Sequence, residues 1–63
     1  MSKFELIARM TDYLEDACAY LATGELKMFY YSAGKANAIE HMLDDEYMDE
    51  HIQNMLDIID ENW

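Results

Sequence analysis

Residues 44–63, DDEYMDEHIQNMLDIIDENW, decide the fold because they carry the clearest helical pattern in the chain. Their apolar side chains are spaced four, three, one, three and four residues apart. That spacing places them on one face of a helix with about 3.6 residues per turn, while the opposite face is almost purely anionic. The apolar row consists of Met48, Ile52, Met55, Leu56, Ile59 and Trp63.

The apolar face of this segment is wider than a single neighbouring helix covers. A second, partly apolar row brings the arc to about half of the cylinder, against about 100° for an ordinary surface helix. Asp44 and Asp45 are suited to form the preceding turn and the N-cap. We therefore predict a helix over about 46–61 that needs more than one partner. The second row consists of Tyr47, His51 and Ile58.

A helix with an equally wide apolar surface is predicted over about 3–22. Ser2 and Glu5 have the spacing of a capping box, in which each side chain accepts a hydrogen bond from the other's backbone N–H. Gly24 is suited to the left-handed position that ends a helix. The two apolar rows contain Phe4, Ile7, Leu14, Cys18 and Leu21, and Leu6, Met10, Tyr13, Ala17 and Tyr20.

The segment 25–43 permits two interpretations. Its middle, residues 32–38, is rich in small side chains, and Gly34 inside a helix costs about 1 kcal/mol relative to alanine. One interpretation is a continuous helix whose slim waist lets another helix approach closely; the other is a break, with Ser32 capping a shorter helix. Alanine's helix propensity and the persistence of the apolar row favour the continuous helix. The same face contains Leu26, Phe29, Ala33, Ala36, Glu40 and Leu43.

The composition predicts an all-α chain that associates with itself. The 63 residues contain no proline and two glycines, and 52% of them are apolar. Because domains this short bury only about 60% of their unfolded surface, excess apolar surface favours a partner. We predict a single domain, 1–63, of three antiparallel helices paired into a homodimer, although some of the aromatic and methionine side chains would also suit a groove for another protein.

The charge is distributed unevenly. The net charge is −10, and residues 36–63 contain nine acids and no Lys or Arg. Direct binding of nucleic acid or of an anionic membrane is disfavoured because both normally require a basic face. Acids near the end of the last helix, Asp57, Asp60 and Glu61, oppose its dipole. They fit either a solvated face that keeps the protein soluble or a surface that binds a basic patch of another protein, as a nucleic-acid mimic would.

No pattern of catalytic or metal-ligating residues is present. His41 and His51 stand among carboxylates, but the sequence lacks the glycine of a calcium loop and the Glu-x-x-His spacing of di-iron bundles. Cys18 lies on an apolar row, where thiols behave as small hydrophobic groups. We therefore expect no enzymatic activity and no cofactor. The single cysteine, the lack of a membrane-length apolar run and the lack of a signal-like start favour the cytoplasm.

Two stretches, FELIARM at 4–10 and YSAGKANA at 31–38, are the most recognisable parts of a whole-chain resemblance. The chain resembles small early proteins encoded between the exonuclease and excisionase genes of lambdoid temperate phages. The resemblance implies a cytoplasmic, non-enzymatic accessory protein that influences host physiology or the choice between lysis and lysogeny through protein contacts. It assigns no catalytic or ligand-binding role to any residue. A purely structural dimerisation module is the alternative.

Overall fold

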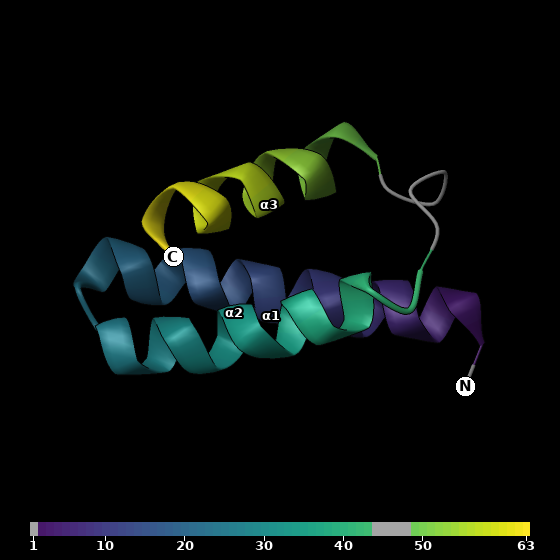
Figure 1. The fold of residues 1–63 in the computed structure, drawn as a ribbon, viewed down its shortest axis with the longest axis horizontal. Coiled ribbons are helices and arrows are strands. Elements are labelled where there is room, and N and C mark those ends of the chain that lie inside the picture. The colour runs from purple at the N-terminus through teal and green to yellow at the C-terminus, as the bar shows by residue number, and fades with distance from the viewer. Residues whose placement is uncertain (1, 44–48) are drawn as a thin grey trace.

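The computed structural model describes residues 2–43 and 49–63, which form three α-helices and no strand (Figure 1). The helices are α1 (Lys3–Thr23), α2 (Leu26–Glu40) and α3 (Glu50–Asn62). The prediction of an all-α chain with three helices is therefore confirmed.

The first helix begins and ends where the sequence predicts. Ser2 Oγ accepts a hydrogen bond from the Glu5 N–H at 3.2 Å, which is one half of the expected capping box. Gly24 adopts a left-handed φ of 78°. Its N–H donates to the Leu21 carbonyl at 3.2 Å, and the Glu25 N–H donates to the Tyr20 carbonyl at 2.9 Å. These two bonds form a Schellman motif, which ends α1 and turns the chain directly into α2.

The second helix is continuous through Ser32 and Gly34, so the alternative of a break at Ser32 is wrong. It ends at Glu40, three residues before the predicted limit of 43. The Met42 N–H donates to the Ile39 carbonyl at 2.9 Å, and the next N–H also bonds three residues back. These shorter loops tighten the chain into a turn. Leu43 remains half-buried against the core, which is why the apolar row extends past the helix end.

The third helix begins at Glu50, about one turn later than predicted. Asp49 has extended backbone angles, φ −82° and ψ 176°, and its Oδ1 accepts a hydrogen bond from the Ile52 N–H at 2.9 Å. Asp49 is therefore the N-cap of this helix. The turn and cap expected at 44–45, and the predicted first helical turn at 46–48, lie outside the described residues. Asp49 has the same capping chemistry as Asp44 and Asp45, so the position of the cap is ambiguous in the sequence.

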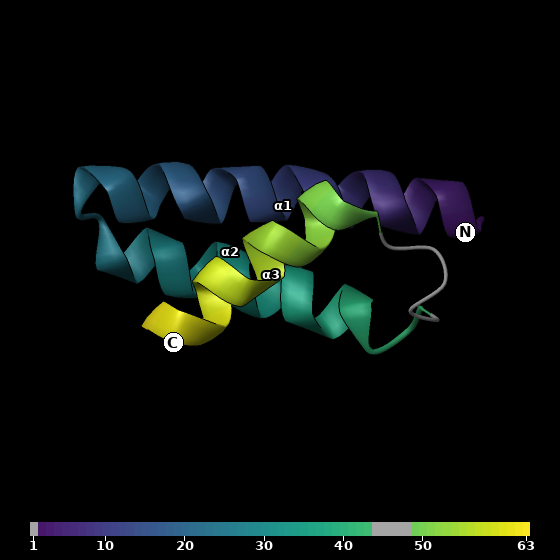
Figure 2. The same ribbon diagram turned by 90° about the horizontal axis from the view of Figure 1, so that it is seen from above.

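The helices are arranged as an antiparallel pair with a third helix laid across it. About 1.5 Å per residue makes α1 long enough to span the 32 Å longest dimension of the molecule. Figure 1 shows α3 on one side of the α1–α2 pair, running antiparallel to α2. Figure 2 shows that α3 crosses the pair obliquely, starting near α1 and ending over α2. Its first half therefore faces α1, and its last turns face α2.

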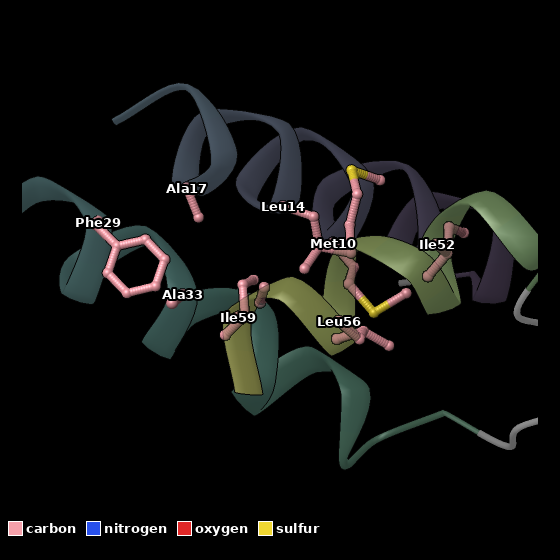
Figure 3. Packing of buried hydrophobic residues seen from close by; sticks show 10 residues of the cluster. Met10, Leu14, Ala17, Phe29, Ala33, Ile52, Leu56 and Ile59 are labelled. Atoms are coloured by element: carbon pink, nitrogen blue, oxygen red, sulfur yellow. The ribbon is translucent and has the colours of Figure 1, made fainter. Parts of the chain in front are cut away.

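The core combines small and large side chains from the helix pair with four large ones from α3 (Figure 3). The fully buried Ala17, Ala33 and Ala36 let the backbones of α1 and α2 approach closely along their length. None of the buried side chains of α3 is small, and its backbone lies farther from the pair. The core consists of Met10, Leu14 and Ala17 from α1, Phe29, Ala33 and Ala36 from α2, and Ile52, Met55, Leu56 and Ile59 from α3.

Candidate protein-interaction surface

The apolar residues predicted to form the core or a dimer seam fall into three groups. Ile7 and Leu21 are half-buried at the edge of the core. Phe4 and Trp63 are 81% and 64% exposed, and Met48 lies outside the described residues. The remaining candidates are buried within the single chain. These are Met10, Leu14, Phe29, Ile52, Met55, Leu56 and Ile59.

Most of the apolar face of α3 is thus covered by the chain itself. α3 crosses the pair obliquely (Figure 2). Its backbone approaches α1, and its side chains line a groove together with residues of α2. The second row is not covered in this way: His51 is exposed and Ile58 is 40% exposed, while Tyr47 lies outside the described residues. Large apolar side chains elsewhere remain exposed, including Leu26, Tyr31 and Met42.

The three acids near the end of α3 are exposed but do not occupy equivalent positions. Asp60 lines a groove between α2 and α3, whereas Asp57 and Glu61 do not. Successive residues of a helix are rotated by about 100°, which places Asp60 beside the buried row and the other two on the opposite side of the helix. The structure therefore divides the acids that the sequence grouped together.

The groove between α2 and α3 has apolar walls and polar edges. Ala33, Leu56 and Ile59 form its apolar part. Glu40 from α2 and Asp60 from α3 contribute one carboxylate each, and the side chain of Asn37 also lines it. The enclosed volume is about 40 Å³, far below the roughly 300–1,000 Å³ of a pocket for a small-molecule ligand. A groove of this size accommodates part of one side chain.

Trp63 also lines this groove. Its indole lies against α2, where a Cβ placed on Gly34 would be 4.0 Å from Trp63 Cη2. Tyr30 contacts the indole edge-on, with ring centroids 5.8 Å apart and an interplanar angle of 77°. Tyr30 in turn packs edge-on against the buried ring of Phe29, at 5.2 Å. This chain of aromatic contacts fixes the orientation of an indole that is still largely exposed.

Sequence reasoning identified some of these residues and missed others. The slim waist expected near Gly34 is where the indole of Trp63 approaches α2. The sequence pattern places Glu40 on the apolar face of its helix with no role of its own, offers Tyr30 only as one of several aromatic side chains suited to a core or an interface, and gives no role to Asn37. The signal for Glu40 was a carboxylate on an otherwise apolar face, which is uncommon unless the carboxylate has a partner.

The lining of the groove includes no basic side chain. No Lys or Arg follows Lys35 in the sequence. The Lys35 ammonium itself lies 5.5 Å from the centroid of the Tyr31 ring, a cation–π distance. The potential around the groove is therefore negative, because its two carboxylates and the neighbouring acids of α3 add together.

Cys18, His41 and His51 lie outside the lining of this groove. Cys18 is a free, half-buried cysteine packed against the core, and burial raises the pKa of its thiol. The protonated thiol is the poorer nucleophile. His41 and His51 are both exposed, the first at the C-cap of α2 and the second in the first turn of α3. Among the residues that the structure describes, no three His, Cys, Asp or Glu side chains are grouped to hold a metal ion.

No helix within 2–43 or 49–63 is both long and apolar enough to cross a membrane. Comparison of the chain with protein-family models, with curated proteins and with solved structures finds no match.

Proposed function

We propose that this protein is a non-catalytic interaction module that binds a basic surface of another protein through the end of α3. The three exposed acids Asp57, Asp60 and Glu61 are called the α3 acidic face below. Their position carries the proposal. The last turn of α3 contains no basic residue, so these carboxylates stand near the negative end of the helix dipole with nothing on that turn to offset them.

Helix stability alone does not account for this arrangement. Carboxylates at a helix C-terminus cost a few tenths of a kcal/mol to about 1 kcal/mol each. Acids in the first turn have the opposite effect, as Glu50 does in α3 and Glu5 does in α1. A solvated face needs charge, but either sign would keep the chain soluble. A basic partner would favour acids alone. Their charge would speed the association of the two proteins and fix the orientation in which their surfaces meet.

The test is capture of a partner from phage-infected bacterial cells, using the tagged protein, chemical crosslinking and mass spectrometry. The test variant carries Asp57→Asn, Asp60→Asn and Glu61→Gln. A matched control carries Asp12→Asn, Glu15→Gln and Asp16→Asn, three exposed acids of α1, so that both variants change the net charge equally. We expect roughly tenfold weaker capture for the α3 variant and nearly unchanged capture for the control. Equal capture by wild type and the α3 variant would contradict the proposal.

The setting that we propose is a lambdoid phage infection, in which the protein acts early in the host cytoplasm on a host or phage regulator. The whole-chain resemblance supports this setting. Capture of the same basic protein at early times after infection, and a change in the ratio of lysogeny to lysis on deletion of the coding sequence, would support it. Deletion without any change in that ratio or in host growth would contradict it.

A second candidate function is a structural module that only associates with itself. Exposed apolar side chains favour it, chiefly Phe4, Tyr31 and Met42, because such residues are enriched at interfaces. Sedimentation at micromolar concentration tests the homodimer: a monomer would contradict it. A dimer that captures no specific basic protein would favour the structural module over the interaction module.

A further inference from the structure

We propose that the groove between α2 and α3 is a receptor site for one arginine side chain of the basic partner. The guanidinium would stack on the indole of Trp63 and donate hydrogen bonds to the carboxylates of Glu40 and Asp60, with the aliphatic stem against Leu56 and Ile59. The inference rests on the proposed function and assigns the partner chemistry that its surface recognises.

The composition of the groove matches the two parts of an arginine side chain. Arginine has an apolar stem of three methylene groups that packs on apolar surface and a charged head that stays at the edge. Leu56, Ile59 and Ala33 supply the apolar surface, and the carboxylates stand among the polar lining. With about 40 Å³ enclosed, the groove has room for a side-chain tip and not for a larger ligand.

The two carboxylates give the groove a negative charge that a cation of the partner would complement. Glu40 and Asp60 come from different helices, and the fold brings their like charges to one groove. Like charges disfavour each other, so a cation between them relieves repulsion as well as gaining attraction. The sequence holds no Lys or Arg beyond Lys35, whose ammonium lies over the Tyr31 ring.

Trp63 selects arginine over lysine. Tryptophan is the most favourable aromatic side chain for cation–π contact, and the planar guanidinium also stacks on it. The indole is 64% exposed, yet its contacts with Tyr30 and Gly34 hold it in one orientation at the groove. A guanidinium also donates several hydrogen bonds in a fixed plane, which suits two carboxylate acceptors, whereas an ammonium is a compact point charge.

The direct test titrates the full-length protein with an arginine hexapeptide, with a lysine hexapeptide of equal charge as the comparison. Trp63 is the sole tryptophan, so its fluorescence reports on the groove itself. We expect the arginine peptide to change the Trp63 emission and to bind roughly threefold or more tighter than the lysine peptide. Equal affinities, or binding of the arginine peptide without any change in Trp63 emission, would overturn the assignment.

Paired substitutions separate the groove from general electrostatic attraction. The groove variant carries Glu40→Gln and Asp60→Asn; the control carries Asp12→Asn and Glu15→Gln, two exposed acids of α1 that do not line the groove. Both variants change the net charge by the same amount. We expect about tenfold weaker arginine-peptide binding for the groove variant and less than about twofold for the control. Equal losses would overturn the groove site. Circular dichroism establishes that each variant is folded.

The same two variants, tested in the capture experiment, distinguish failure of this inference from failure of the proposed function. Suppose that the groove variant captures the basic partner as well as its control does, while the three-residue α3 variant fails to capture it. The α3 acidic face then binds the partner, and the arginine site is wrong. If the three-residue α3 variant captures the partner as wild type does, the proposed function is wrong. If the groove variant alone loses both the peptide and the partner, the arginine site is supported.

Discussion

The α1–α2 pair and α3 are built on different principles. The pair is joined by a tight Schellman turn at Gly24, and buried alanines bring its two backbones close together. The third helix is anchored by four large side chains, lies farther from the pair and carries unopposed acids at its end. The difference teaches that close backbone packing stabilises the α1–α2 pair. The third helix is less constrained, so it can present acidic side chains and an exposed indole to solvent.

The largest effect is expected from Phe29→Ala in the helix pair. Phe29 is fully buried and its ring contacts Tyr30, so truncation should cost about 3–5 kcal/mol of the free energy of unfolding. Urea denaturation followed by circular dichroism measures the loss. The control is Tyr31→Ala on the same helix, where the side chain is 58% exposed and the expected change is within about 0.5 kcal/mol. A Phe29→Ala loss no larger than that of the control would show that the pair does not hold the core.

Close packing of the pair is tested by adding volume. Ala33→Leu inserts a large side chain at a fully buried position, which should cost about 1–3 kcal/mol through overpacking. Ala38→Leu makes the same chemical change at an exposed position of the same helix and should be nearly neutral. Thermal unfolding of both variants gives the comparison. If Ala33→Leu is tolerated as well as Ala38→Leu, the packing around Ala33, which also borders the groove with α3, is looser than the structure shows.

Substitution of the N-cap of α3 tests whether this helix opens independently of α1 and α2. Asp49→Ala removes the hydrogen bond from the Ile52 N–H to Oδ1 and should cost about 1 kcal/mol. Native-state hydrogen exchange should show faster exchange in α3 and little change in α1 and α2, because the more loosely packed helix opens locally. Ser2→Ala removes the corresponding cap of α1 and is the control. Equal acceleration in all three helices would mean that the molecule opens only as one unit.

The smallest expected effect is an increase in stability when Gly34 is replaced. Gly34→Ala should stabilise the protein by about 0.5–1 kcal/mol, because alanine has the higher helix propensity. The new Cβ would meet Trp63 at 4.0 Å, an ordinary contact distance. Gly24→Ala is the opposite case, since its φ of 78° is strained for any residue with a Cβ, and it should destabilise. A loss of stability in Gly34→Ala would show that the indole lies closer to α2 than the structure places it.

Local signals in the sequence predicted much of the fold but could not place every boundary. Ser2 and Gly24 have chemistry that specifies one end of a helix each, and both act as expected. Asp44, Asp45 and Asp49 all have the chemistry of an N-cap, so local preference alone did not select among them. Likewise, Leu43 belongs to the apolar row of α2 because it packs on the core, not because it is helical.

The candidate site was less predictable, because it depends on how helices meet. Periodicity showed that Asp57, Asp60 and Glu61 lie outside the buried row, but not that Asp60 alone borders a groove. It placed Trp63 on the buried face of α3, whereas the ring lies largely exposed over Gly34. Glu40 becomes part of the same groove only because α3 crosses α2 at that point.

By itself, the sequence determined three helices, their apolar faces, the turn at Gly24 and the strongly acidic second half. These properties arise from interactions between residues a few positions apart. Only the tertiary structure decided that one chain encloses most of the apolar face of α3 and that two carboxylates and an indole gather at one groove. The physical reason is that the helical period specifies which face of a helix is apolar, whereas the crossing of the helices specifies what covers that face.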